Sequence, residues 1–220
     1  MMRRDDTAGI TAVGGQIGGG DTADPSGALA LLQVLRCKGA AGIDLLAMAT
    51  EVPETVVSQR LSVLCARGDC VWAGQRACLT PAGRTRLAEL LALERRSLDP
   101  GALRPLVTKF GVVNAEFKAL LTGWQRADIT AAAFTDRFQA LHRRTRKVLE
   151  RLATVVPRLA VYPRRLERAA GLVTAGDLTW LASPLHDSYH SIWFELHQEL
   201  LELTGRDRAA CEEAGESGQP

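Results

Sequence analysis

PETVVSQRLSVLCARGDCVWAGQRACLTPAGRTR, residues 53–86, is the stretch that decides the fold. Pro53 suits the first turn of a helix, and Gly68 suits the residue just past the end of one. Residues 69–80 then form two short runs around a turn, which predicts a β-hairpin. A second proline opens an amphipathic helix that is predicted over residues 81–96. The stretch is therefore expected to fold as a helix, a hairpin and a helix.

Two apolar segments precede this stretch. Residues 26–39 carry leucine and valine near helical spacing, and residues 42–50 form a second, shorter apolar helix. The break at Val52-Pro53 separates this helix from the next one, because proline restricts the residue before it. The order of elements predicts an N-terminal winged helix-turn-helix domain over residues 26–97.

This order of elements resembles the MarR/ArsR-type winged-helix regulators, and three features carry the resemblance. The helix that begins at Pro53 has a polar outward edge in front of apolar residues. ARGDCVW (Ala66–Trp72) ends that helix at a glycine and turns into a strand. LTPAGR (Leu79–Arg84) looks like the strand-to-helix exit of the family. The resemblance is confined to this part of the chain.

The resemblance implies a regulator that binds double-stranded DNA as a homodimer. In such folds the third helix lies in the major groove and the hairpin contacts the DNA backbone. The residues expected to face bases or phosphates are Thr55, Ser58, Gln59 and Arg60, and the expected wing contact is Arg76.

The charge of this domain departs from the family pattern. The recognition helix has one arginine and also carries Glu54, and the short wing holds one basic residue. Five arginines oppose two acids between residues 53 and 86, a net charge of +3. Phosphate contacts supply most non-specific affinity, so we expect modest binding unless a dimer doubles it. The alternative is a winged helix that no longer binds DNA and serves as a protein-contact module.

Length and composition set further bounds. The chain has 220 residues and a net charge of +2, which does not by itself demand nucleic acid or a membrane. It has no apolar run of about 18 residues, and residues 1–25 lack the apolar core of a secretory signal. Those residues are rich in glycine and aspartate and are expected to form a flexible arm. We therefore expect a cytoplasmic protein with no membrane contact.

The chain beyond residue 97 is expected to be helical. Apolar residues recur there at helical spacing in several segments. The expected helices span residues 102–124, 130–156, 164–172, 175–181 and 184–203. The fold class is therefore mainly α. A winged helix-turn-helix with a small β-hairpin is followed by an all-α domain over residues 98–204, which we expect to dimerise and bind an effector, and by a polar tail over residues 205–220.

Charge is distributed unevenly in this helical half. Ten basic residues oppose two acids between residues 137 and 168, a net charge of +8. Eight acids oppose two arginines between residues 187 and 216, a net charge of −6. One interpretation is a second surface for DNA phosphates or for an anionic ligand. We favour the other, in which the basic and acidic helices are neighbours within or between subunits.

Histidines and aromatic residues gather in the last expected helix. His186, His190 and His197 are spaced i, i+4 and i+11, so they share the apolar side of the helix. A small-molecule pocket is one interpretation, because such pockets combine apolar walls with a few polar groups. The residues expected to line it are Trp124, His186, Tyr189, His190, Trp193 and His197. The alternatives are a metal ion on two of the histidines, and histidines that only bond within the core. We assign no metal and no other cofactor.

Two segments also show a weaker similarity to another class of protein. DSYHSIWFELHQELLEL (Asp187–Leu203) and NAEFKALLTGWQ (Asn114–Gln125) are similar to sequence appended to some actinobacterial phosphoenolpyruvate-utilising proteins. This similarity implies a freestanding regulatory module. The chain has no GxSxG motif, and the glycines of residues 14–20 lack the GK[ST] ending of a phosphate loop. We therefore assign no catalytic residue and do not expect an enzyme.

Three cysteines, Cys65, Cys70 and Cys78, are expected near one another in the winged helix. They allow a redox or thiolate-metal switch, but no CxxC motif is present. The other interpretation, which we favour, is that they are small buried residues where the helix meets the hairpin.

Overall fold

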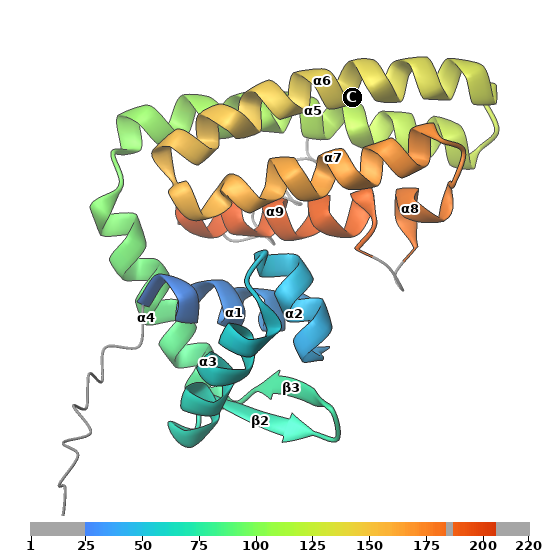
Figure 1. Ribbon diagram of the computed structural model, residues 1–220. Coiled ribbons are helices and arrows are strands. Elements are labelled where there is room, and N and C mark those ends of the chain that lie inside the picture. The colour runs from blue at the N-terminus through green and yellow to red at the C-terminus, as the bar shows by residue number, and fades with distance from the viewer. Residues whose placement is uncertain (1–24, 184–186, 206–220) are drawn as a thin grey trace, which may run out of the picture.

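The computed structural model describes residues 25–183 and 187–205. It consists of a winged helix and a helical domain, one below the other in Figure 1, connected by the helix α4. The two parts have separate hydrophobic cores, one built from residues 29–91 and the other from residues 103–203. The chain is thus mainly α with one small antiparallel sheet, as the sequence predicted.

The winged helix follows the predicted order, with one strand added. Its elements are α1 (Pro25–Lys38), β1 (Ala40–Ala41), α2 (Ile43–Thr50), α3 (Glu54–Ala66), β2 (Cys70–Ala73), β3 (Arg76–Leu79) and α4 (Pro81–Ser97). The strand order is β1-β3-β2, and both pairs are antiparallel. The sequence did not reveal β1, because two alanines carry no alternating pattern.

Local signals explain where these elements start and stop. Gly68 has a φ of 77°, which a side chain disfavours, and it follows the end of α3. The Thr80 hydroxyl accepts a hydrogen bond from the backbone N–H of Gly83 at 3.0 Å and so caps α4. Gly83 is also required sterically, since a Cβ there would overlap the carbonyl oxygen of Asp69. The predicted LTPAGR transition therefore depends on both a cap and a glycine.

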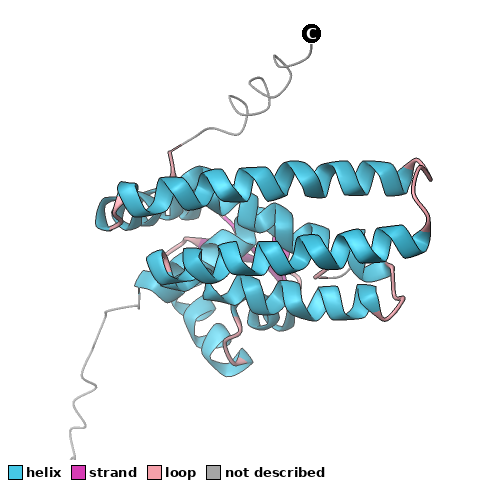
Figure 2. Ribbon diagram, turned by 90° about the horizontal axis from the view of Figure 1, so that it is seen from above, coloured by secondary structure: helices cyan, strands magenta, loops and turns pink. Residues whose placement is uncertain are grey.

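The helical domain contains two long helices and several shorter ones. Its elements are α5 (Pro100–Gln125), α6 (Ala131–Val155), the 3₁₀ turn η1 (Pro157–Ala160), α7 (Val161–Thr174), α8 (Thr179–Ala182) and α9 (Tyr189–Leu203). Helices α5 and α6 pack along each other, above α7 and α9 in Figure 1, and Figure 2 shows the same long helices from above. Thr130 caps α6 by accepting a hydrogen bond from the N–H of Ala133 at 3.3 Å.

The structure corrects the bounds of three predicted helices. Helix α7 begins at Val161, earlier than predicted, and α8 begins only at Thr179. Helix α9 begins at Tyr189, because the Ser188 hydroxyl accepts a hydrogen bond from the N–H of Ser191 and caps it there. Within the described ranges, no helix combines the length and apolarity needed to cross a bilayer.

Candidate functional site

The outer edge of α3 is polar and faces solvent. Val57 and Leu61 turn into the core, while Thr55, Gln59 and Ser62 are exposed. At about 100° per residue these three side chains fall on one side of the helix. Helix α3 and the hairpin lie at the end of the molecule that points away from the helical domain (Figure 1). The edge is therefore accessible to a large partner.

The structure places the other two predicted residues of α3 differently. Ser58 lies half-buried on the flank of the edge. Arg60 is turned toward α1, where its guanidinium occupies the space that a Cβ at Gly27 would need. This placement corrects the grouping of Arg60 with Thr55 and Gln59. Ser62 was missed, although its position seven residues after Thr55 would have revealed it.

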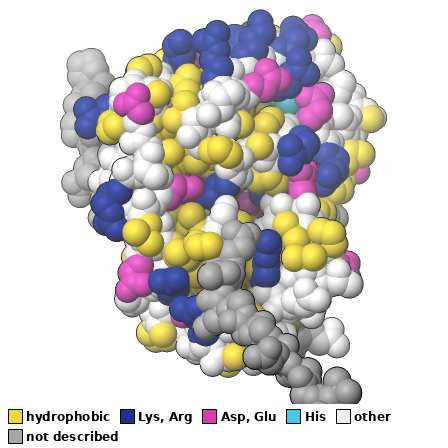
Figure 3. Space-filling model, turned by 60° about the vertical axis from the view of Figure 1, so that its left-hand side comes forward, with side chains coloured by type: hydrophobic (Ala, Val, Ile, Leu, Met, Phe, Trp, Pro, Cys, Tyr) yellow, Lys and Arg dark blue, Asp and Glu magenta, His cyan; other side chains and the backbone are white. Residues whose placement is uncertain are grey.

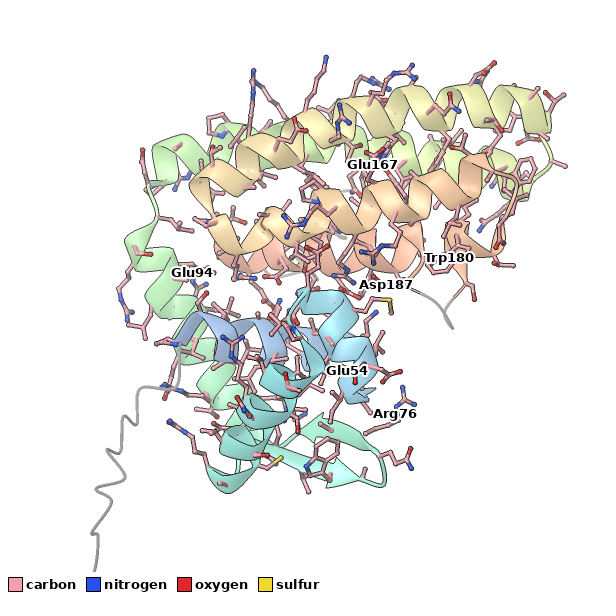
Figure 4. All side chains as sticks on the ribbon, viewed as in Figure 1. Glu54, Arg76, Glu94, Glu167, Trp180 and Asp187 are labelled. Carbon is pink, nitrogen blue, oxygen red and sulfur yellow. The ribbon has the colours of Figure 1, made fainter. Side chains whose placement is uncertain are left out.

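Arg76 is exposed at the start of β3, where Figure 4 labels it. Its guanidinium Nη2 donates a hydrogen bond to the Ala40 carbonyl at 2.9 Å. Arg76 also borders a cleft that His190 of α9 borders from the other domain. The predicted wing contact therefore lies on the side of the wing that faces the helical domain.

The wing exposes apolar surface where a DNA-binding wing would carry basic residues. Val71 is 52% exposed and Trp72 is 42% exposed, and Val63 on the neighbouring helix is 39% exposed. Arg67 lies 3.6 Å from the Asp69 carboxylate, which offsets part of the positive charge nearby. This surface suits a protein partner as well as a nucleic acid.

The aromatic residues of α9 pack into the core and fill it. Trp193 and Tyr189 are buried, and the Trp193 ring lies 4.5 Å from that of Phe117 and 5.2 Å from that of Phe110 between centroids. The Trp193 Nε1–H donates a hydrogen bond to Asn114 Oδ1 at 2.8 Å. The space predicted for a ligand beside Trp193 is thus occupied by other rings.

The remaining residues of the predicted pocket do not surround a common space. Trp124 packs on Phe134 with centroids 4.8 Å apart. His197 is half-buried near Phe110, and His190 is exposed, contrary to the prediction that the histidines turn inward. His186 lies outside the described residues. The predicted pocket around Trp124, Tyr189, His190, Trp193 and His197 is therefore not the arrangement found.

The fourth histidine has partners on both ring nitrogens. His142 Nδ1 lies 3.2 Å from the Tyr189 hydroxyl, and Nε2 lies 3.0 Å from Glu167 Oε2. Figure 4 shows Glu167 between α6 and α7. Within the described part of the chain, no cluster of three or more His, Cys, Asp or Glu side chains is placed to hold a metal ion.

Cys65, Cys70 and Cys78 of the winged helix are free, and burial lowers the reactivity of the first two. Burial raises the pKa of the Cys70 thiol to about 12 and also raises the pKa of Cys65. A thiolate is the reactive form, so neither residue suits a redox switch near neutral pH. These values favour the interpretation of Cys70 as a small core residue.

Buried ion pairs join the helical domain to the winged helix, and the sequence did not reveal them. Arg165 of α7 bonds to Asp187 and, at 2.8 Å, to Glu195 of α9. The other oxygen of Glu195 lies 2.6 Å from Lys38 Nζ at the end of α1. Figure 4 shows Asp187 at the level where the two domains meet. We call this set of residues, Arg165, Asp187, Glu195 and Lys38, the first interdomain cluster.

A second interdomain cluster joins η1, α7 and α9 to α4. Arg158 donates hydrogen bonds to Glu94 of α4 at 2.9 and 2.8 Å, and it lies 2.6 Å from Glu199. The Tyr162 hydroxyl donates to Glu199 at 3.1 Å. Burial alone would lower the pKa of Arg158, but Glu199 and Glu94 outweigh burial and raise it above its ordinary value. The arginine therefore stays charged in this interface.

These clusters account for part of the uneven charge. The end of the basic stretch and acidic α9 are neighbours within one chain, because Arg158 of η1 pairs with Glu199 and Arg165 of α7 pairs with Glu195. The basic residues of α6 lie elsewhere. Figure 3 shows lysine and arginine side chains along the top of the molecule, where α6 runs, on the side opposite α3. Part of that row is paired, since Arg144 bonds to Glu116.

Comparisons with known proteins returned no match to a family model, to a curated protein or to a solved structure.

Proposed function

We propose that this chain is a dimeric, cytoplasmic transcriptional regulator of MarR/ArsR type that binds double-stranded DNA. The observation that carries the proposal is the exposed polar edge of α3 at the free end of a winged helix. Thr55, Gln59 and Ser62 offer hydroxyl and amide groups, which pair with base edges in the major groove. The order of the helices and strands along the chain and the three-stranded sheet support the same class of protein.

The weak positive charge of this face supports binding through two subunits. Arg60 is turned toward α1 and Arg76 toward the helical domain, so few basic side chains flank the edge. Phosphate contacts dominate the affinity of DNA-binding proteins, so a single winged helix of this kind binds weakly. A homodimer on a pseudo-palindromic site would double every contact.

The interface between the domains supports regulation by an effector. Buried ion pairs and a cleft lie where α1, α3 and α4 meet η1, α7 and α9. A ligand that binds one relative position of the domains better than another shifts the population toward that position. In a dimer such a shift changes the spacing of the two α3 helices, and DNA affinity changes with it.

A second function, that of a protein-contact module, is favoured by one observation. Val71 and Trp72 expose apolar surface on the wing, beside an edge that carries little positive charge. Tryptophan is enriched at the energetic centres of protein interfaces. This proposal expects no salt-dependent binding to any DNA sequence.

A selection experiment separates the two functions. The purified full chain is incubated with a random duplex library, and bound sequences are enriched over several rounds and then titrated between about 50 and 300 mM salt. An enriched palindromic motif, with affinity that falls steeply with salt, supports the regulator. Enrichment of no motif, together with binding no tighter than to bulk DNA, contradicts it and favours the protein-contact module. Light scattering during size-exclusion chromatography tests the dimer independently.

A further inference from the structure

A cleft between the two domains contains charged side chains that the proposed DNA contacts do not use. Its walls come from α1, α2 and α3 on one side and from η1, α7 and α9 on the other, and its volume is about 230 Å³. Arg60 of α3 and Arg164 of α7 line opposite sides. Apolar side chains such as Val52 and Val161 complete the walls. The cleft thus combines cationic groups with a short apolar surface.

The charge of the cleft walls favours an anion. Four arginines line the cleft, against one glutamate, Glu199. Two of the arginines, Arg158 and Arg165, are held by the buried acids of the interdomain clusters. Arg60 and Arg164 are not members of those clusters, but each already has an interaction of its own. The side chain of Arg164 is 61% exposed and pairs with Glu51. An incoming anion can therefore engage Arg164 without opening the buried clusters.

Gly27 determines the position of Arg60 in this cleft. It is buried in α1, and any larger residue would displace the guanidinium of Arg60, since its Cβ would overlap the guanidinium atoms. The close approach of the arginine to the backbone of α1 is a physical reason for a glycine here.

We propose that this cleft binds a small organic anion, whose carboxylate or phosphate lies between Arg60 and Arg164. Guanidinium groups form strong, directional hydrogen bonds with both kinds of oxyanion. The apolar part of the ligand packs on the side chains of Val52 and Val161. Drug-sized ligands occupy pockets of about 300–1,000 Å³, so this cleft fits a smaller metabolite.

The position of the cleft connects the ligand to the proposed function, on which its role as an effector site rests. Arg60 belongs to the recognition helix, whereas Arg164 belongs to the helical domain. An anion held by both restrains how α3 is placed relative to α7. Binding of the anion and binding of DNA are therefore coupled, and each changes the affinity of the other by the same factor.

Benzoate and butyrate test the site, with benzamide and butyramide as neutral counterparts of the same shape. Binding to the purified full chain is measured by calorimetry and by the rise in melting temperature at matched ionic strength. We expect both acids to bind and both amides to bind at least about tenfold more weakly, since charge-assisted hydrogen bonds are lost. Equal binding of acids and amides, or no binding of either acid, overturns the proposal.

Matched variants locate the site. R60Q and R164Q should each weaken benzoate binding by about tenfold or more, whereas R143Q, on the exposed face of α6, should leave it unchanged. G27A, which displaces the Arg60 guanidinium, should act like R60Q if either arginine variant fails to fold. Unchanged affinity in folded R60Q, R164Q and G27A overturns the proposal.

These measurements are independent of DNA, so the two proposals can fail separately. The chain could select no DNA motif and still bind the acids more tightly than the amides, with R164Q weakening that binding. In that case the anion site in the cleft is supported, and its role as an effector site is rejected. If the chain selects a DNA motif but binds neither acid, the proposal of a regulator is supported and the proposal of an anion site in the cleft is overturned.

Discussion

Arg165 and Asp187 form a buried, bidentate ion pair where the helical domain meets the winged helix. Nε donates to one carboxylate oxygen at 2.9 Å and Nη2 donates to the other at 2.5 Å. The side chain of Arg165 is only 1% exposed, and it also holds Glu195, which is bonded to Lys38 of the winged helix. One guanidinium therefore fixes α7, the start of α9 and, through Glu195, the end of α1.

Replacing this guanidinium should destabilise the chain strongly. R165M leaves Asp187 and Glu195 buried with only Lys38 to compensate them. Breaking a buried pair in this way costs about 3–5 kcal/mol, because an uncompensated charge remains. Urea unfolding followed by circular dichroism measures the loss. R143M, which truncates an exposed arginine of α6, should change the free energy of unfolding by less than about 0.5 kcal/mol. An equal loss of unfolding free energy in the two variants would show that the buried cluster contributes no more to stability than an exposed arginine does.

Acid should weaken the same pair. Burial raises the pKa of Asp187, but the hydrogen bonds and charge of Arg165 outweigh burial and hold the pKa below its ordinary value of 3.8. The carboxylate therefore contributes stability that is fully present above about pH 3.8 and is lost as the pH falls through the lower, folded value. The urea concentration at the unfolding midpoint should therefore decrease as the pH is lowered from 5 to 2.5. In D187N the fall should be shallower. A parallel fall in both proteins contradicts the assignment.

The winged helix could be predicted because its signals are local. Pro53, Gly68 and the Thr80-Pro81 step mark helix ends through backbone geometry, which depends on few neighbours. Helix α9 shows what such local signals do not predict. Its periodicity assigns Glu195 and Glu199 to a polar side, yet they are 3% and 2% exposed. Periodicity shows that one side of a helix is polar. It does not show whether that side faces solvent or a buried arginine from a distant part of the chain.

The candidate site was only partly accessible to sequence reasoning for the same reason. The exposed edge with Thr55 and Gln59 follows from helical spacing, and the same spacing turns Arg60 away from it. The aromatic residues of α9 were correctly expected to lie on an apolar side, but packing of Trp193 against Phe117 fills the space that a ligand would need. The cleft at Arg60 and Arg164 depends on how the two domains meet, which no local pattern encodes.

Two glycines should respond to alanine in opposite directions. In G83A the new Cβ meets the backbone carbonyl of Asp69, so α4 or the loop before the hairpin must shift. Overpacking of this kind costs about 1–3 kcal/mol. In G111A the new Cβ meets no atom within 4 Å on the exposed side of α5, and the gain in helix propensity is about 0.5–1 kcal/mol. Thermal unfolding of both variants tests this, and a stable G83A protein would contradict the close approach.

Two thiols with raised pKa values, those of Cys37 and Cys70, should resist alkylation in the native protein. Burial, with help from Glu195 and Glu199, raises the pKa of Cys37 from 9.0 to about 12, and burial raises that of Cys70 to about 12. A rise of this size lowers the thiolate fraction at pH 8 by roughly a thousandfold. Iodoacetamide labelling, followed by peptide mass spectrometry, should leave both residues unmodified until guanidinium chloride is added. Rapid labelling of Cys70 in the folded chain would mean that the hairpin opens readily.

The exposed edge of α3 should decide DNA specificity without contributing to stability. T55A combined with Q59A removes a hydroxyl and an amide that face solvent, so the free energy of unfolding should change by less than about 0.5 kcal/mol. Each lost base contact costs about 1–3 kcal/mol, so affinity for a selected site should fall at least tenfold, while binding to unrelated DNA should stay the same. The matched control is T108A combined with Q125A, which removes the same two side chains from the exposed surface of α5.

The variant R60Q distinguishes the two roles considered for Arg60, which are DNA contact and anion binding in the cleft. If it lowers affinity for the selected site as much as the double variant does, Arg60 contacts DNA. If it leaves that affinity intact but removes the response to benzoate, Arg60 belongs to the cleft.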